Sequence, residues 1–308
     1  MDLKSKDLLG MQNLSFEEIN LLCDTAKSFV EIATRPIKKV PVLRGKTVAN
    51  LFFEPSTRTR LSFELAARRL SADIVDIPAM ISSAAYGETL TDLAKTIEAM
   101  TVDFIVVRHS MAGAPHQLAR QIKCSVINAG DGSHEHPTQA LVDLYTIKEK
   151  KGYIEGLRVA IIGDILHSRT AKSNIWGLKT MGAKVVLIGP KTLIPPGIER
   201  LGVDTSYRME EGLRGVDVII LSRVELTEQN RALLPSLREY SRFYCLNEER
   251  LGYAQKNVLV MHSGSMNRGV EIAPEVADGA FSVIIEQVTN AVAVDMAVLY
   301  LLSGGKKS

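Results

Sequence analysis

The chain of 308 residues is long enough for about two domains, and its 46% hydrophobic and 23% charged residues are typical of a soluble globular protein. The net charge is only +2, with lysine and arginine spread along the whole chain, which argues against a nucleic-acid-binding protein. Three scattered cysteines and an N-terminus without an apolar secretory segment predict a cytoplasmic protein. The apolar run 291–302 is interrupted by Asp295 and is too short to cross a bilayer, so no membrane association is expected.

The first half of the chain alternates predicted strands and helices. A capping box, Ser15-x-x-Glu18, opens the first helix. Hydrophobic periodicity then predicts strands at 47–53, 74–77, 104–108 and 125–128, and helices from 56, over 89–100 and over 140–150. This alternation predicts a parallel α/β sheet, with ligands at the carboxyl ends of its strands.

A charged, glycine-bearing stretch at 150–156 marks a domain boundary, and a second set of the same kind follows it. Strands are predicted at 159–163, 184–188, 218–221 and 258–261, and helices over 169–181 and 283–302. The sequence therefore predicts two doubly wound parallel-sheet domains, residues 1–150 and residues 151–282.

The turn from the first strand into its helix has the features of an anion site. Ser56 is a natural helix N-cap, and the helix after it carries Leu61, Leu65 and Ala66 on one face. Residues 56–60 (STRTR) bring two hydroxyl residues and two guanidinium groups to a helix N-terminus, where free N–H groups favour anions. Since the helix dipole disfavours cations there, the arginines favour a phosphate site over an ordinary capped helix.

Further polar side chains follow the other predicted strands. Together with the turn they form one set: Arg58, Thr59, Arg108, His136, Gln139, Arg169 and Arg223. The set holds four arginines and neither a catalytic carboxylate nor a thiol. It therefore predicts anionic substrates and a reaction that depends on positioning and charge stabilisation, without a covalent enzyme intermediate.

No cofactor or metal is expected from the sequence. Residues 163–169 follow a strand but lack G-x-G-x-x-G, which argues against a dinucleotide site. His134 and His136 flank Glu135, but no cysteine or histidine partner stands at ligand spacing, so no metal site is predicted.

Six motifs carry a family resemblance: 53–60 (FEPSTRTR), 108–109 (RH), 136–139 (HPTQ), 163–169 (GDILHSR), 189–195 (GPKTLIP) and 267–272 (NRGVEI). From about residue 8 to residue 302 the chain resembles the catalytic chain of the bacterial aspartate transcarbamoylase (aspartate carbamoyltransferase) family. The resemblance implies a carbamoyl-phosphate domain (1–150), an aspartate domain (151–282) and a C-terminal helix, about 283–308, that packs back on the first domain. It also implies a homotrimer with active sites at subunit interfaces, and it leaves open an association with regulatory or dihydroorotase chains.

The resemblance also implies roles for individual residues. Ser56, Thr57, Arg58 and Thr59 would bind the phosphate of carbamoyl phosphate. Thr59, Arg108 and His136 would polarise its carbonyl oxygen, Gln139 would hold the carbamoyl nitrogen, and Gly264 and Ser265 would complete the site. Arg169 and Arg223 would bind the two carboxylates of L-aspartate, and a neighbouring subunit would contribute Ser82. In the family's reaction, a step of pyrimidine biosynthesis, the amine attacks the carbonyl and phosphate leaves as proton acceptor, which yields N-carbamoyl-L-aspartate.

Four positions depart from the family pattern. Tyr86 stands where the family has a lysine, Glu225 where it has a glutamine, and Ser263 and Ser265 where it has prolines. Three readings follow from these departures: an aspartate transcarbamoylase that tolerates them, a transcarbamoylase with another amine acceptor, or a catalytically silent homologue with an assembly or regulatory role. We expect carbamoylation of aspartate to be weakened, because an ammonium group is lost and a carboxylate is added.

Overall fold

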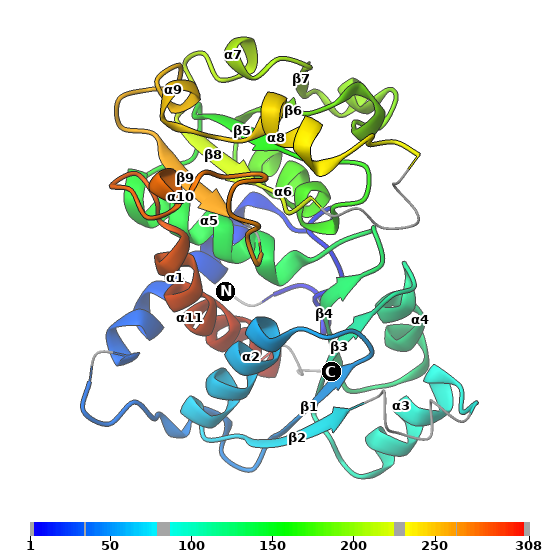
Figure 1. Cartoon of the computed structure of the whole chain (residues 1–308). Helices are drawn as coiled ribbons and strands as arrows, with labels where there is room; N and C mark the ends of the chain where they lie inside the picture. The colour runs from blue at the N-terminus through cyan, green and yellow to red at the C-terminus, as the bar shows by residue number, and fades with distance from the viewer. Residues whose placement is uncertain (1–2, 34, 79–86, 225–231, 263, 305–308) are drawn as a thin grey trace. The chain divides into compact units, whose positions relative to one another are not determined.

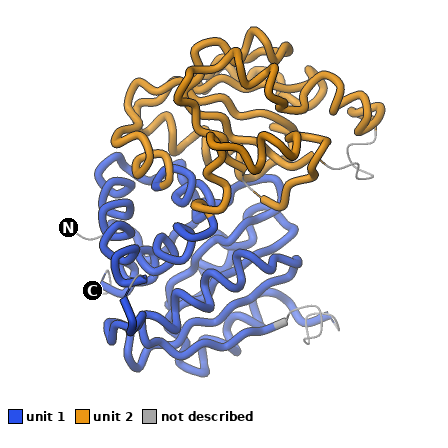
Figure 2. Tube along the Cα trace, turned by 60° about the vertical axis from the view of Figure 1, so that its left-hand side comes forward, with its two compact units in different colours: residues 1–145, 288–308 blue, residues 146–287 orange. Residues whose placement is uncertain are grey.

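The computed structural model describes residues 3–33, 35–78, 87–224, 232–262 and 264–304. The chain divides into two compact units, unit 1 with residues 1–145 and 288–308, and unit 2 with residues 146–287 (Figure 2). Each unit is built on a parallel sheet with helices between successive strands (Figure 1). The predicted α/β fold with two parallel sheets is confirmed.

Unit 1 contains a four-stranded sheet in the order β2-β1-β3-β4, with all pairs parallel. Its strands are β1 (Thr47–Phe52), β2 (Asp73–Pro78), β3 (Phe104–His109) and β4 (Ser125–Asp131). Its helices are α1 (Phe16–Ala33), η1 (Pro41–Leu43), α2 (Thr57–Arg69), α3 (Leu90–Ala99), α4 (Ala114–Gln121), the first part of α5 (Pro137–Lys151) and most of α11 (Ile284–Gly304).

The strand register of unit 1 aligns the carboxyl ends of its inner strands. Phe52 at the end of β1 pairs with Arg108 of β3, and His109 of β3 pairs with Asp131 of β4. The three inner strands β1, β3 and β4 are largely buried, as parallel strands covered on both faces are, and β2 at the sheet edge is more exposed. Consequently the loops after β1, β3 and β4 meet at one edge of the sheet.

The C-terminal helix α11 packs on unit 1, as expected. The ring of Tyr300 meets Phe29 of α1 edge-on, with centroids 5.8 Å apart, and Asp295 lies against Ser62 of α2. By length and composition alone α11 could cross a membrane, but most of its residues are buried inside the protein. That burial is typical of a core helix.

Unit 2 contains a five-stranded parallel sheet in the order β7-β6-β5-β8-β9. Its strands are β5 (Arg158–Ile162), β6 (Lys184–Ile188), β7 (Asp204–Ser206), β8 (Val218–Leu221) and β9 (Leu259–His262). Its helices are α6 (Arg169–Thr180), η4 (Lys191–Leu193), η5 (Ile198–Leu201), α7 (Met209–Gly212), α8 (Leu237–Tyr244), α9 (Glu248–Leu251) and α10 (Pro274–Ala277). The strand order changes direction at β5, and the polar loops after β5 and β8 lie beside each other there.

One packing prediction is wrong. Helix α2 buries Phe63, Ala66 and Ala67 against the sheet, whereas Leu61 and Leu65 are 47% and 43% exposed. Ala66 thus lies on the buried face as expected, but the two leucines lie on the other side of the helix. The apolar residues of α2 follow two stripes, and periodicity alone does not tell which stripe meets the core.

Candidate active site

The strand-to-helix turn after β1 is formed as predicted. Ser56 occupies the N-cap position of α2 and its carbonyl accepts from the N–H of Arg60 at 3.1 Å, but its side chain makes no capping hydrogen bond. The first turn of α2 therefore keeps backbone N–H groups that the Ser56 hydroxyl does not satisfy. Arg60 turns aside to pair with Asp76 at 3.2 Å, so Arg58 is the arginine of this turn that faces the other strand ends.

Arg58 is held in a chain of polar side chains. Its guanidinium donates to Gln139 Oε1 at 3.2 Å, and Gln139 Nε2 donates to Asp143 Oδ1 at 2.8 Å. Burial lowers the pKa of Arg58, and the negative charge of Asp143 opposes that shift. Because Asp143 accepts only from the nitrogen end of the amide, the oxygen of Gln139 is directed toward Arg58.

Arg108 approaches the same edge from β3. Its guanidinium donates to the carbonyl oxygen of Ala129 at 3.2 Å and pairs with Glu54 at 3.4 Å. Its side chain is only 15% exposed, so both contacts fix the direction of a largely buried charge.

His136 is 5% exposed and lies at the start of α5. Its Nδ1 accepts from the backbone N–H of Gln139 at 3.4 Å and lies 3.2 Å from the hydroxyl of Thr138. A ring nitrogen that accepts an N–H carries no proton, so these contacts assign the proton of the neutral ring to Nε2. In this tautomer His136 is a hydrogen-bond donor at Nε2.

In unit 2, Arg169 and Arg223 follow neighbouring strands. Arg169 is the first residue of α6, which the Ser168 hydroxyl caps by accepting from Ala171 N at 3.1 Å. Arg223 is exposed and lies two residues after β8. The residues that precede the two arginines meet each other, because the hydroxyls of Ser168 and Ser222 are 3.4 Å apart. The structure therefore brings both guanidinium-bearing loops to the same edge of the second sheet.

The loop with Gly264 and Ser265 follows β9 in unit 2. The His262 side chain is fully buried, and its Nδ1 lies 3.0 Å from the backbone nitrogen of Gly264 while its Nε2 lies 3.1 Å from Glu271. This histidine therefore anchors the start of the loop. The predicted residues Ser82, Tyr86, Glu225 and Ser263 lie outside the described residues.

Sequence reasoning missed two residues that hold the site together, Glu54 and Asp143. Glu54 lies inside the motif 53–60, and Asp143 stands one helical turn after Gln139, so its i, i+4 spacing was the available signal. Both were missed because their contacts are with other side chains, Arg108 for Glu54 and Gln139 for Asp143.

In comparisons with known proteins, two domain descriptions of one family match this chain, one in each half. The family description "Aspartate/ornithine carbamoyltransferase, carbamoyl-P binding domain" matches residues 6–149, and "Aspartate/ornithine carbamoyltransferase, Asp/Orn binding domain" matches residues 155–302. The chain belongs to the aspartate/ornithine carbamoyltransferase family.

Curated relatives and solved structures support this membership in the carbamoyltransferases. The chain is 59% identical over 305 residues to the aspartate carbamoyltransferase catalytic subunit of Moorella thermoacetica, and 57% identical over 304 residues to that of Syntrophus aciditrophicus, with 99% of each chain covered. The aspartate transcarbamoylase of Trypanosoma cruzi in complex with carbamoyl phosphate and aspartate is similar at a TM-score of 0.85, with 28% identity and 97% and 95% of the two chains covered. The ornithine carbamoyltransferase of Pyrococcus furiosus is similar at a TM-score of 0.88, with 31% identity over the full length of both chains.

Within this carbamoyltransferase, the site residues divide between the two matched domains. Residues 56–59, Arg108, His136 and Gln139 lie in the domain described as carbamoyl-P binding, and Arg169 and Arg223 lie in the one described as Asp/Orn binding. The role of each individual residue stays a prediction.

Proposed function

We propose that this protein is an aspartate carbamoyltransferase, which transfers the carbamoyl group of carbamoyl phosphate to the amine of L-aspartate. The observation that carries the proposal is the Arg58–Gln139–Asp143 chain at the strand ends of a domain matched as carbamoyl-P binding. The relatives at 57–59% identity are named for the same activity. The products are N-carbamoyl-L-aspartate and phosphate, and the reaction would serve pyrimidine biosynthesis.

The phosphate end of carbamoyl phosphate is assigned to the first turn of α2. Ser56, Thr57 and Thr59 offer hydroxyl and backbone donors, and Arg58 adds a charge that is already partly desolvated. The side-chain oxygen Oε1 of Gln139 accepts from the carbamoyl NH₂ group. Since Asp143 fixes the orientation of the Gln139 amide, the acceptor is preorganised for that contact.

The carbonyl of carbamoyl phosphate is assigned to Thr59, Arg108 and His136. Nε2–H of neutral His136 and the guanidinium of Arg108 donate to the oxygen on which negative charge develops as the amine attacks. The new N–C bond forms as the C–O bond to phosphate breaks, and the leaving phosphate takes the proton of the amine. Glu54 and Asp143 act here as positioning residues for Arg108 and Gln139.

The two carboxylates of aspartate are assigned to Arg169 and Arg223. Each guanidinium can bind a carboxylate through two parallel N–H···O bonds, which fixes the direction as well as the charge of the acceptor. Their placement after neighbouring strands β5 and β8 suits a short dicarboxylate. We include Gly264 and Ser265 in the carbamoyl-phosphate site on the strength of the family resemblance.

We further propose that the protein acts in the cytoplasm as a homotrimer in which a neighbour supplies the loop with Ser82. The exposed Leu61 and Leu65, one helical turn apart on α2, form an apolar pair that suits a subunit interface. Regulatory or dihydroorotase chains remain candidates for further association.

The function is tested by a steady-state assay with carbamoyl phosphate and L-aspartate, together with thermal unfolding in the presence of phosphate. Wild-type protein should form N-carbamoyl-L-aspartate, and phosphate should raise its Tm by mass action. Arg58→Ala should abolish the Tm shift and lower kcat/KM by about 100-fold or more, because a charge-assisted contact to the reacting group is lost. The matched control is Arg60→Ala, since Arg60 pairs with Asp76 instead. Equal losses in the two variants, or an unchanged phosphate shift in Arg58→Ala, would contradict the assignment.

A further inference from the structure

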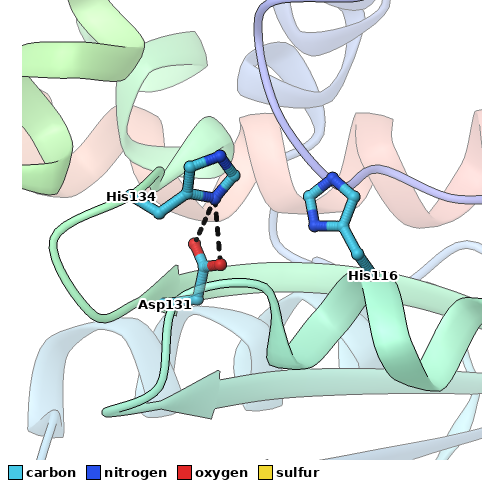
Figure 3. A group of neighbouring side chains, drawn as sticks. All are labelled: His116, Asp131 and His134. Carbon is cyan, nitrogen blue, oxygen red and sulfur yellow. Dashed lines mark hydrogen bonds and ion pairs between the residues drawn. The ribbon is translucent and has the colours of Figure 1, made fainter.

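Three potential metal ligands meet in unit 1 beside the region just described: His116, Asp131 and His134 (Figure 3). One ligand atom from each residue lies within 4.8 Å of the others. Asp131 ends β4, His134 lies in the loop that follows, and His116 comes from the first turn of α4. No sequence spacing connects His116 with the other two, because the sheet brings α4 and this loop together.

The carboxylate of Asp131 is held rigidly. The side chain is fully buried, its Oδ1 accepts from Asn128 Nδ2 at 2.9 Å and from Glu135 N at 3.1 Å, and its Oδ2 accepts from Gly113 N at 2.7 Å. Gly113 is the N-cap residue of α4, so this last bond ties the helix of His116 to the carboxylate. Hydrogen bonds of this kind orient a carboxylate ligand in the way that outer partners do in metal sites.

The two histidines face this carboxylate with their ring nitrogens. His134 Nδ1 lies 3.0 Å from Asp131 Oδ2, and the rings of His116 and His134 meet edge-on with centroids 5.5 Å apart. His116 Nδ1 is buried and has no hydrogen-bond partner among the described residues. A buried polar nitrogen without a partner is costly, and a bound cation would satisfy it. The side chain of His134 is 41% exposed, which leaves an approach from solvent.

We propose that His116, Asp131 and His134 bind a divalent first-row transition cation, with Zn²⁺ as the best fit. Two imidazoles and one carboxylate form an N₂O ligand set, and water can complete a tetrahedral shell. Imidazole ligands favour zinc, nickel or copper over Mg²⁺ and Ca²⁺, which prefer oxygen atoms alone. Binding takes the place of the contact between His134 Nδ1 and Asp131 Oδ2.

The His134–Asp131 pair needs only a small adjustment, and the His116 nitrogen, which lies within 4.8 Å of both, would approach the same cation. Metal bonds of about 2.0–2.2 Å at a tetrahedral angle place two ligand atoms about 3.4 Å apart. The present separation of His134 Nδ1 and Asp131 Oδ2 is 3.0 Å, and a half-exposed histidine can move outward by the remaining few tenths of an ångström. A bound cation would link α4 to residues 131–135. These residues immediately precede His136 in the chain.

The test uses untagged protein stripped of metal with a chelator and titrated with ZnCl₂ by calorimetry, without substrates. We expect one zinc per chain with micromolar or tighter affinity and a rise in Tm with zinc concentration. His116→Ala and His134→Ala should each weaken binding by at least about tenfold. The matched control is His167→Ala, which removes the imidazole of another His–Asp pair, 2.8 Å from Asp164, and should leave the affinity unchanged.

Two results would overturn the proposal: no binding by wild-type protein at millimolar zinc, or wild-type affinity in either site variant. The Tm of each variant without metal establishes that it folds. His134 is half-exposed, so His134→Ala keeps the test decisive if His116→Ala does not fold. Because binding is measured without carbamoyl transfer, failure of the proposed enzymatic function leaves this result interpretable.

Discussion

Asp295 places an ionisable carboxyl group in the core of unit 1. The residue is 2% exposed on α11, and burial raises its pKa to about 8, opposed by the Ser62 hydroxyl. Between about 3.8, the ordinary value, and about 8, the folded chain therefore binds one more proton here than the unfolded chain. Stability then falls as pH rises through that window, by up to about 1.4 kcal/mol per pH unit.

We therefore predict that Asp295→Asn stabilises the protein by a few kcal/mol near pH 8 and has little effect near pH 4. Asparagine has the shape of the neutral carboxyl group and cannot lose a proton, so the decline with pH should flatten. Chemical denaturation at a series of pH values measures this. Asp73→Asn, at an exposed aspartate, is the control. Parallel pH curves for wild type and Asp295→Asn would show that Asp295 is not protonated in the folded protein.

At the scale of single residues, the sequence indicated candidate substrate-binding side chains better than the side chains that hold them in place. Arg58, Arg108, His136 and Gln139 could be named because their residue types follow strands and suit anionic chemistry. Asp143 and Glu54 hold other side chains, Gln139 and Arg108, and the Glu54–Arg108 contact depends on the strand register. His116 was missed as a potential metal ligand for the same reason, since α4 brings it to Asp131 only in three dimensions.

The loop after β4 depends on one glycine. Gly132 has φ of +48°, and a Cβ there would lie 2.8 Å from both Ala112 N and Ser110 O. Both neighbours are backbone atoms, so they cannot move aside by a rotamer change. The turn that presents Asp131, His134 and His136 therefore requires glycine.

We predict that Gly132→Ala lowers the free energy of unfolding by about 2 kcal/mol or more, because backbone strain and a steric clash add. Gly45→Ala is the control: its φ of +79° brings similar strain, but nothing lies within 4 Å of the added Cβ, so it should cost about 1 kcal/mol. Denaturant unfolding of both variants measures the difference. Equal costs would mean that the loop relaxes around the new methyl group.

Among the elements, the buried parallel strands were the most predictable. Each is an apolar run bounded by polar or glycine residues, and eight of the nine described strands were expected at nearly their observed positions. Helices α4, α7, α8, α9 and α10 and strand β7 were not predicted. Helix α4 has only eight residues and begins after Gly113 in a left-handed conformation, while β7 has three residues at a sheet edge. Elements this short carry too few periodic positions to be recognised and form mainly through contacts with the rest of the unit.

At the scale of the whole molecule, the exposed leucines of α2 predict self-association. Light scattering at micromolar concentration should give three times the mass of a single chain. Leu61→Glu should reduce that mass toward the single chain, because a carboxylate would be buried in an apolar contact. Tyr153→Glu, at another exposed hydrophobic residue, should leave the assembly intact. A single-chain mass for the wild type, or a closed dimer with its two-fold contact, would contradict the trimer.

The last prediction concerns the positions that depart from the family pattern. A tyrosine phenol is neutral near pH 7 and offers one donor, so Tyr86 cannot replace the ammonium group of the family's lysine. By the family resemblance Glu225 would add a negative charge to a site for a dicarboxylate, and Ser265 lacks the stiffness of proline. The triple change Tyr86→Lys, Glu225→Gln and Ser265→Pro should therefore raise kcat/KM for aspartate at least about tenfold, or about 1.4 kcal/mol of transition-state stabilisation. Each single change should achieve less, because groups that share one site need not act additively.

If the wild type is already fast and the triple change leaves it unaltered, these positions do not limit the reaction. If activity appears only with a neutral or cationic amine, the acceptor is not aspartate, and Glu225 becomes the residue that selects it.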